Sequence, residues 1–411
     1  MTSIPKCRFC GTELKNTFVD LGETPLANSY LKDLSEFETE KSYPLHARVC
    51  SSCFLVQVED VVPAEEIFSD YAYFSSFSSS WVEHAKLYSE RLIQKLSLNK
   101  NSLVVEVASN DGYLLQHFAE HQIPVLGIEP AANVASVAKN KNIPTEIAFF
   151  GEETAKRLSN DGYKADLIAA NNVMAHVPDI NDFVAGFPII LAADGVLTIE
   201  FPHLLNLIDK TQFDTIYHEH YSYLSLLTVE TILRNHGLRV FDVEELPTHG
   251  GSLRVYACHD SSSIHQTSDQ LKEIRLKEKS ASLDCLSAYE GFAPKVEQVK
   301  KDLLSFLNTA VKNGKKVVGY GAAAKGNTLL NYCKISANQI EFVVDKNPEK
   351  QGTYLPGSHI PVYSPDKILE IKPDYVLILP WNLTQEITQQ MSSIKQWDGQ
   401  FVTPIPSLKI I

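Results

Sequence analysis

The sequence predicts an α/β protein in which a small N-terminal lobe precedes two units with parallel sheets. A buried strand, a polar turn and an amphipathic helix follow one another from Ser102, and the same order recurs from Lys315. Four cysteines near the N-terminus predict a separate lobe there. We expect the lobe at 1–70, Rossmann-like units at 71–265 and 317–411, and a charged, solvated helical connector at 266–316.

Composition and charge restrict the class of partner. The chain has 411 residues, 44% of them apolar, and a formal net charge of −13, which argues against a nucleic-acid-binding surface. It has no run of about eighteen apolar residues, and its first residues lack the apolar core of a signal peptide. We therefore expect a cytoplasmic protein with no membrane association. The sequence leaves the oligomeric state open, and a monomer is compatible with it.

Two C-x-x-C pairs predict a zinc site in the lobe. Each pair places two thiolates on one side of an ion, and two pairs complete a tetrahedral shell. The expected ligands are Cys7, Cys10, Cys50 and Cys53. The alternative is a set of buried or redox-active thiols. A closed shell of four thiolates leaves no position for substrate, so the zinc is expected to be structural.

The central unit predicts a nucleoside site at the carboxyl ends of its strands. Its second strand ends at Glu129, about twenty residues after the first turn, where a carboxylate can bind ribose hydroxyl groups. A third strand ends at "NNVMAH" beside the same edge. The expected cofactor-binding residues are Glu106, Ser109, Asn110, Asp111, Glu129, Pro130, Asn171 and Asn172.

The turn of this unit favours S-adenosylmethionine over a dinucleotide. Pyrophosphate binding needs the glycines of G-x-G-x-x-G, but Ala108 and Asn110 stand in their places. S-adenosylmethionine has no phosphate, and its sulfonium cation suits an acidic turn that contains Glu106 and Asp111. A polar turn without a ligand is the alternative for this segment taken by itself.

The segment "IYHEHYSYLS", from Ile216 to Ser225, concentrates imidazole, carboxylate and phenol groups in ten residues. Such a set suits proton transfer, metal ligation, or a polar loop whose groups only satisfy one another. The histidines are two residues apart, which does not fit the H-E-x-x-H spacing of a helical zinc site. Proton transfer is therefore the favoured hypothesis.

Further motifs follow the cysteine pairs along the chain: "DYAYFSSFSSSW", "VVEVASNDGYLL", "GIEP", "NNVMAHV", "EFPHL", "YHEHYSYLS", "THGGSLRVY" and "VVGYGAAAKGNTLLN". In this order they resemble the sugar C-3'-methyltransferases that act on nucleotide-linked 4-ketosugars. The resemblance covers nearly the whole chain. It implies a zinc-binding N-terminal lobe, a central class I methyltransferase domain that binds S-adenosylmethionine, and a C-terminal Rossmann-like domain. A dTDP- or GDP-linked sugar would lie between them, and which sugar it is stays open.

Such a reaction needs a base, because removal of the C3 proton beside the 4-carbonyl gives an enolate that can take a methyl group. His220 is the expected base and Glu219 the competing candidate. On an extended strand His218 and His220 would face one side and Glu219 the other. Tyr217 and His176 are expected to stabilise the oxyanion. The resemblance places this segment at the sugar, and the expected sugar-binding residues are Tyr71, Tyr73, His218 and Tyr221.

The C-terminal unit contains a second glycine turn, in "GYGAAAKGN". Its backbone N–H groups and Lys325 can bind a phosphate at a helix N-terminus. By the resemblance, Lys325 and Asn327 belong to the sugar-nucleotide site. Asp345 ends the next strand, which supports the alternative of an NAD-dependent oxidoreductase or epimerase acting on a sugar nucleotide. A zinc-dependent scaffold without catalysis is a further alternative.

Overall fold

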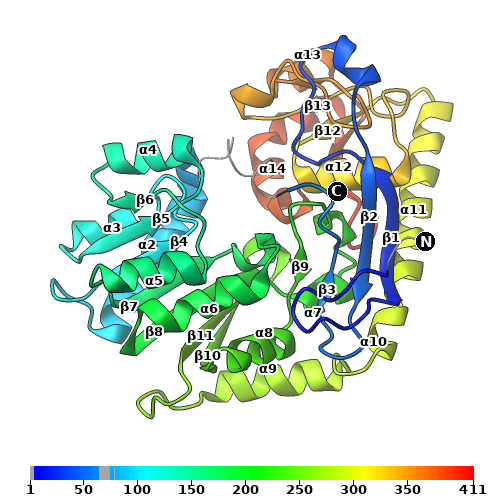
Figure 1. Cartoon of the computed structure of the whole chain (residues 1–411). Helices are drawn as coiled ribbons and strands as arrows, with labels where there is room; N and C mark the ends of the chain where they lie inside the picture. Colours follow the sequence, from blue (N-terminus) through cyan, green and yellow to red (C-terminus); the bar gives the residue numbers. More distant parts are fainter. Residues whose placement is uncertain (1–3, 64–74, 78) are drawn as a thin grey trace.

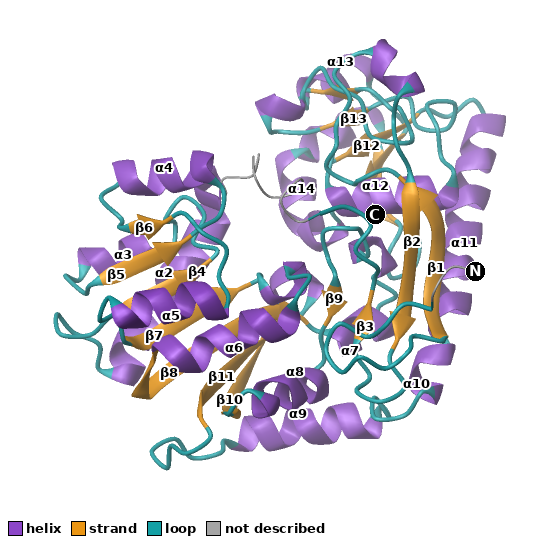
Figure 2. Ribbon diagram, viewed as in Figure 1, coloured by secondary structure: helices purple, strands orange, loops and turns teal. Residues whose placement is uncertain are grey.

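The computed structural model describes residues 4–63, 75–77 and 79–411, which form three sheets flanked by helices (Figures 1 and 2). Figure 1 shows the seven-stranded sheet and its helices on the left. The four-stranded and six-stranded sheets lie together on the right. The predicted α/β class, with a small N-terminal lobe and two Rossmann-like units, is confirmed.

The central sheet has the strand order β10-β11-β8-β7-β4-β5-β6. Its strands are β4 (Val104–Val107), β5 (Val125–Ile128), β6 (Thr145–Glu146), β7 (Ala165–Asn171), β8 (Leu191–Pro202), β10 (Leu238–Leu246) and β11 (Ser252–His259). The strands from β8 to β6 are parallel, whereas β11 runs antiparallel to both of its neighbours, β8 and β10. Because β4, β5 and β7 are parallel neighbours, their carboxyl ends meet at one edge.

Helices cover both faces of the central sheet. Those that pack on it are α2 (Ser79–Leu96), α3 (Leu115–Glu120), α4 (Ala132–Asn140), α5 (Glu152–Asn160), α6 (Ile180–Ile190) and α8 (Leu226–Asn235). The cores show that α2 and α3 lie on one face, and that α5, α6 and α8 lie on the other. Helices therefore shield both faces of the sheet from solvent, as the apolar composition of strands such as β7 requires.

The C-terminal sheet has the order β14-β13-β12-β15-β16-β17 and is parallel except at β17. Its strands are β12 (Val317–Tyr320), β13 (Val343–Val344), β14 (Val362–Tyr363), β15 (Tyr375–Ile378), β16 (Gln400–Thr403) and β17 (Lys409–Ile410). Its helices are α12 (Ala324–Cys333), α13 (Asp366–Ile371) and α14 (Thr384–Gln390).

The sheet of the N-terminal lobe takes one strand from outside the lobe. Its strands, all antiparallel, are β1 (Asn16–Thr24), β2 (Tyr43–Val49), β3 (Val56–Gln57) and β9 (Ser222–Tyr223). Strand β9 belongs to the "YHEHYSYLS" segment. This segment reaches the lobe after helix α7 (Leu204–Asp209), which follows the central strand β8. The histidine-rich segment is thereby held between the lobe and the central domain.

The connector is helical as predicted, but it is not simply solvated. Its helices are α9 (Asp269–Ser280), α10 (Ser287–Glu290) and α11 (Phe292–Lys312). Helix α11 buries Phe292, Leu303 and Leu307 in a core that it shares with β1, β2 and the C-terminal domain. Phe292 stacks on Phe18 of β1, with ring centroids 4.3 Å apart. The amphipathic helix therefore joins two parts of the chain through its apolar side.

Short 3-10 helices in the described part of the chain carry several residues of the site. They are η1 (Leu34–Glu38), η2 (Ser75–Phe77), η3 (Met174–His176), η4 (Phe213–Thr215), η5 (Thr248–Gly250), η6 (Pro348–Lys350), η7 (Trp381–Leu383) and η8 (Ser392–Trp397).

Candidate active site

The sulfurs of the two C-x-x-C pairs lie together, all within 4.8 Å of one another. The Sγ atoms of Cys7 and Cys53 are 3.6 Å apart, and those of Cys10 and Cys50 are 3.4 Å apart. Zinc–sulfur bonds near 2.3 Å place the sulfurs of a tetrahedral shell about 3.8 Å apart, so the four cysteines fit this ion. Gln57 donates from Nε2 to the Cys7 sulfur at 3.2 Å, which suits a thiolate.

The residues predicted to bind the cofactor lie at the carboxyl edge of the central sheet. Burial, and the nearby carboxylates of Glu129 and Asp111, raise the pKa of Glu106 well above its ordinary value. Several buried side-chain atoms at this edge have no hydrogen-bond partner among the described residues: Ser109 Oγ, Asp111 Oδ1, Asn171 Oδ1, and both amide atoms of Asn172. Because buried polar atoms nearly always have partners, this concentration fits a polar ligand such as S-adenosylmethionine.

The backbone at this edge is strained where the cofactor is expected. Ala108 and Asn110 have φ values of 57° and 49°, and Asn172 has 55°, in the left-handed region that non-glycine residues avoid. Ala108 thus adopts the conformation for which glycine is usual. The carboxylate of Glu129 holds the turn, since it accepts backbone N–H groups of Asn110 and Ala131 at 2.9 Å each. Half-buried Pro130 lies between Glu129 and Ala131.

Residues 217–220 form a turn, so the expectation of an extended strand is wrong. The His220 N–H donates to the Tyr217 carbonyl at 2.9 Å, and β9 begins only at Ser222. His218 therefore does not share a face with His220. The Nε2 of His218 donates to the Pro44 carbonyl at 3.1 Å, so its ring lies against the N-terminal lobe.

Two hydrogen bonds fix the ring of His220. Its Nδ1 lies 2.8 Å from the Thr215 carbonyl, and its Nε2 lies 2.8 Å from the Tyr217 hydroxyl. A carbonyl only accepts, so Nδ1 carries the hydrogen, and the Nε2 of the neutral ring accepts the Tyr217 O–H. Burial, and then the charge of His176, hold the pKa of His220 well below its ordinary value. At neutral pH, therefore, Nε2 presents a lone pair.

His176 touches the ring of His220 although the two lie in different parts of the sequence. It ends η3, just beyond β7, and the ring centroids are 4.6 Å apart in an edge-to-face arrangement. Burial lowers the pKa of His176 to about 4. The structure thus brings the two imidazoles of His176 and His220 together with the Tyr217 hydroxyl, beside the edge expected to bind the cofactor.

Glu219 faces a different neighbour from that of His220. Its Oε1 accepts a hydrogen bond of 2.6 Å from the Nδ2 of Asn28, in the segment after β1. Burial raises the pKa of Glu219. Tyr221 is buried, and the guanidinium of Arg8 lies 5.2 Å from its ring centroid.

Lys325 approaches the site from the C-terminal domain. Its Nζ donates to Asn382 Oδ1 at 2.8 Å and lies 4.9 Å from the ring centroid of Trp381. Burial lowers its pKa, and the carboxylate of Asp214 opposes that shift. The positive charge of Lys325 also makes a small contribution to the low pKa of His220.

Helix α12, on which Lys325 lies, begins without a side-chain cap among the described residues. Its first N–H groups are therefore open to a phosphate. Asn327 is buried in the same helix and donates from Nδ2 to the Ala27 carbonyl at 2.7 Å, so it also ties the helix to the N-terminal lobe. Tyr71 and Tyr73, expected at the sugar, lie outside the described residues.

Two residues of this site were missed in the sequence. His249 has a φ of 53° within "THGG", its ring is 5.4 Å from that of Trp81, and its charge acts on the pKa of both His176 and His220. Asp214 is fully buried and accepts the Trp381 Nε1–H at 2.7 Å. A histidine before two glycines was a visible signal for the first. Nothing local marks Asp214, whose partners come from the C-terminal domain.

Comparison with known proteins decides the family. Family models match a zinc binding domain at 7–68, a methyltransferase domain at 81–243 and a C-methyltransferase C-terminal domain at 247–406. C-methyltransferase NovU of Streptomyces niveus is 35% identical over 408 residues, which cover 99% of this chain and 97% of NovU. The chain belongs to this C-methyltransferase family.

Solved structures of methyltransferases are similar to part of the C-methyltransferase. Magnesium protoporphyrin IX methyltransferase from Synechocystis PCC 6803, solved with S-adenosylmethionine, is 13% identical, with 49% of this chain and 100% of that chain covered and a TM-score of 0.36. A S-adenosylmethionine-dependent methyltransferase from Clostridium acetobutylicum is 10% identical, with 43% and 92% covered and a TM-score of 0.35.

The C-methyltransferase is therefore dependent on S-adenosylmethionine and has a zinc-binding N-terminal lobe. This confirms the resemblance found in the sequence. The full-length match to a C-methyltransferase argues against both alternatives, an NAD-dependent oxidoreductase and a scaffold without catalysis. Asp345 had supported the first of these alternatives. Both of its carboxylate oxygens accept backbone N–H groups, of Ala322 and Asn347, at 2.8 Å each. No helix in the described ranges is long and apolar enough to span a membrane.

Proposed function

We propose that this enzyme methylates C3 of a nucleotide-linked 4-keto-6-deoxysugar through an enolate, in the biosynthesis of a branched deoxysugar. The single observation that carries the proposal is the contact between His176 and His220, with Tyr217 bonded to the second imidazole. Carbon is a poor acid, so C-methylation requires a base and a group that stabilises negative charge on a neighbouring oxygen. This cluster supplies both.

His220 is proposed as the base. The Thr215 carbonyl holds its Nδ1–H, which fixes the tautomer whose Nε2 can take the C3 proton. The Tyr217 hydroxyl that rests on Nε2 can turn to the 4-keto oxygen when substrate enters, which frees the lone pair. Glu219 stays the competing base, because its raised pKa makes the carboxylate more basic than usual.

Stabilisation of the enolate oxygen is assigned to Tyr217 and His176. The single N–H of the neutral His176 imidazole is held by the Glu219 backbone carbonyl, and we propose that it turns to the enolate oxygen when substrate enters. The enolate then offers carbon C3 as the nucleophile. S-adenosylmethionine, when bound at the edge formed by β4, β5 and β7, would supply the methyl group.

The nucleotide part is assigned to the C-terminal domain. The open N-terminus of α12 and the amine of Lys325 supply positive potential for a pyrophosphate. Asn327 is proposed to orient the same end of the ligand, and His218 and Tyr221 to support the sugar side of the turn from the lobe. A dTDP- or GDP-sugar satisfies this arrangement.

The test is a mass-spectrometric screen of dTDP- and GDP-linked 4-ketosugars with S-adenosylmethionine. We expect one of them to gain one methylene, and the matched 4-hydroxysugars to gain none because they cannot form the enolate. Equal methylation of a 4-hydroxysugar would overturn the enolate route, since an oxygen would then be the acceptor.

A further inference from the structure

The geometry points to Arg8 as a positioning residue that fixes the spacing of His176 and His220. Arg8 lies between the zinc ligands Cys7 and Cys10, on the first turn of the lobe. The claim about turnover rests on the proposed function, whereas the claim about ring positions rests on the structure alone. Zinc would then contribute to catalysis by holding this arginine in place, in addition to folding the lobe.

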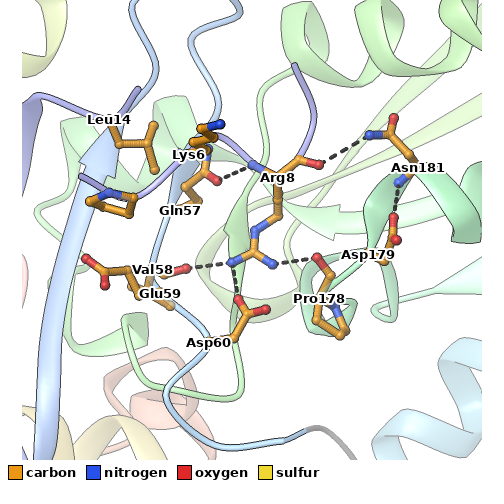
Figure 3. Close-up of a pocket in the computed structure, with 11 residues that line it drawn as sticks. Lys6, Arg8, Leu14, Gln57, Val58, Glu59, Asp60, Pro178, Asp179 and Asn181 are labelled. Carbon is orange, nitrogen blue, oxygen red and sulfur yellow. Dashed lines mark hydrogen bonds and ion pairs between the residues drawn. The ribbon is translucent and has the colours of Figure 1, made fainter. Parts of the chain in front are cut away.

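The guanidinium of Arg8 makes three short contacts (Figure 3). It donates to the Pro178 carbonyl at 2.7 Å and to the Val58 carbonyl at 2.6 Å, and it pairs with Asp60 at 2.8 Å. Its side chain is only 7% exposed, although it lines a pocket of about 670 Å³ between the lobe and the central domain. A planar group with several fixed donors can hold such separate acceptors at once, which a lysine cannot.

These contacts reach both loops that carry the catalytic histidines. Pro178 is two residues beyond His176, and the ring of Tyr221, one residue beyond His220, lies 5.2 Å from the guanidinium carbon. The Val58 N–H also donates to the Tyr221 carbonyl, at 3.1 Å. Arg8 thus lies between the ends of the two loops.

The backbone of Arg8 is itself held on two sides, as Figure 3 shows. Its N–H donates to Gln57 Oε1 at 2.9 Å, and its carbonyl accepts from Asn181 Nδ2 at 3.2 Å. Gln57 belongs to β3, beside β9, and Asn181 to α6 of the central domain. Gln57 also contacts the Cys7 sulfur, so the metal ligand, the arginine and the strand that follows the catalytic turn are coupled.

Because the rings of His176 and His220 are closely packed, with centroids 4.6 Å apart, a shift of either loop changes the direction in which the Nε2 of His220 points. A misplacement of about 1 Å in a catalytic group can cost on the order of a hundredfold in rate. Arg8→Lys keeps the charge but cannot keep all the contacts, and it should therefore loosen both loops without removing a reacting group.

The first arm of the test is nuclear magnetic resonance of the zinc-loaded protein with 13C-labelled histidine. Assignments come from His176→Asn and His220→Asn. We expect Arg8→Lys to shift the imidazole signals of both residues, and Arg48→Lys to leave them unchanged. Arg48 is a matched control because it lies two residues before Cys50, and its guanidinium contacts Glu59 at 3.4 Å. This arm needs no substrate, so its outcome does not depend on the proposed function.

The second arm measures turnover and deuterium wash-in at C3 of dTDP-4-keto-6-deoxyglucose in D2O. Arg8→Lys should lower both by about ten- to a hundredfold at unchanged zinc content and unchanged affinity for S-adenosylhomocysteine, while Arg48→Lys keeps wild-type values. Asp60→Ala, at a half-exposed position, serves if Arg8→Lys folds poorly, and should shift the same two signals less. Unshifted histidine signals in both variants would overturn the positioning role. Shifted signals without any loss of wash-in, in a wild type that shows wash-in, would overturn its role in catalysis.

Discussion

The imidazole of His220 is buried and bonded to the Thr215 carbonyl and the Tyr217 hydroxyl, and these surroundings determine its protonation state and its tautomer. A solvent-exposed histidine is half protonated near its ordinary pKa, whereas burial and the adjacent His176 keep this ring neutral at lower pH. The Thr215 carbonyl selects the tautomer. In the proposed reaction, the tautomer of the base is thus set before substrate enters, but the lowered pKa of His220 makes it a weaker base. Stabilisation of the enolate by neighbouring groups must offset this weaker basicity.

Exchange at C3 distinguishes the two candidate bases. Asparagine at position 220 keeps a polar side chain but cannot accept the proton as imidazole does, so His220→Asn should lower turnover by about 10² to 10⁴-fold and abolish deuterium wash-in. Glu219→Gln retains an acceptor for the Asn28 amide and should only slow wash-in. The opposite pattern, with wash-in lost in Glu219→Gln and kept in His220→Asn, would make the glutamate the base.

The low pKa of His220 predicts where activity fails in acid. Activity needs the neutral ring, so it should be lost only as pH falls through the folded-state pKa of His220, which lies below the ordinary 6.5. The profile of kcat against pH should therefore have its acid inflection below pH 6.5. An inflection at or above that value would show that the base is solvated or is another group.

Removal of the Lys325 amine tests the assignment of the pyrophosphate. A charge-assisted contact contributes roughly 1.5 to 3 kcal/mol, so Lys325→Ala should raise the KM for the sugar nucleotide by about ten- to a hundredfold and leave the affinity for S-adenosylhomocysteine unchanged. Lys346→Ala is the control, because Lys346 is exposed in the same domain. An unaltered KM would place the pyrophosphate elsewhere.

At the scale of elements, the start of helix α8, which follows strand β9, depends on a carboxylate from the connector. Helix α8 begins directly after this segment, and Glu278 of α9 accepts the N–H groups of Leu226 and Leu227 at 2.7 and 2.8 Å. The same carboxylate contacts His203 Nε2 at 2.7 Å and is buried. A carboxylate at a helix N-terminus satisfies N–H groups that have no partner within the helix.

Glu278→Ala should therefore lower the free energy of unfolding by about 3 kcal/mol or more, since it leaves buried donors unsatisfied. Denaturant unfolding measures the change. Glu273→Ala, at an exposed position of the same helix, should change it by less than about 0.5 kcal/mol. Equal effects of the two substitutions would mean that the cap contributes no stability of its own.

At the scale of the molecule, the N-terminal lobe packs on both larger domains. Three of its cysteines, Cys7, Cys50 and Cys53, belong to the core of the central domain, whereas β1 and β2 belong to the core that includes α11 and α12. A lobe shared in this way cannot unfold without exposing apolar surface of its neighbours. The zinc site should therefore affect the stability of the whole chain.

Loss of a zinc ligand should show this effect. We expect about one zinc per chain, and Cys7→Ser or Cys50→Ser should lower the zinc content and give one cooperative unfolding transition at a lower Tm. Cys285→Ser is the control because Cys285 is exposed outside the cluster. Full zinc content and an unchanged Tm in both ligand variants would argue against a structural metal site.

Spacing in the sequence determined the features that depend on neighbours along the chain. Two C-x-x-C pairs predicted the four ligands, because each pair builds half of the shell by itself, and strand–turn–helix order predicted both Rossmann-like sheets. The polar residues that end β4, β5 and β7 were predicted at one edge for the same reason, since parallel strands align their ends.

Only the tertiary structure decided the features that need segments far apart in the sequence. The "YHEH" segment is a turn because its next residues pair with β3 of the lobe, whereas alternation alone suggested a strand. The contact of His176 with His220, the bond of Asn28 to Glu219 and the place of Arg8 between both histidine loops depend on that pairing. Local propensity carries no information about such contacts, because their energies arise only when the cores of the three parts have packed together.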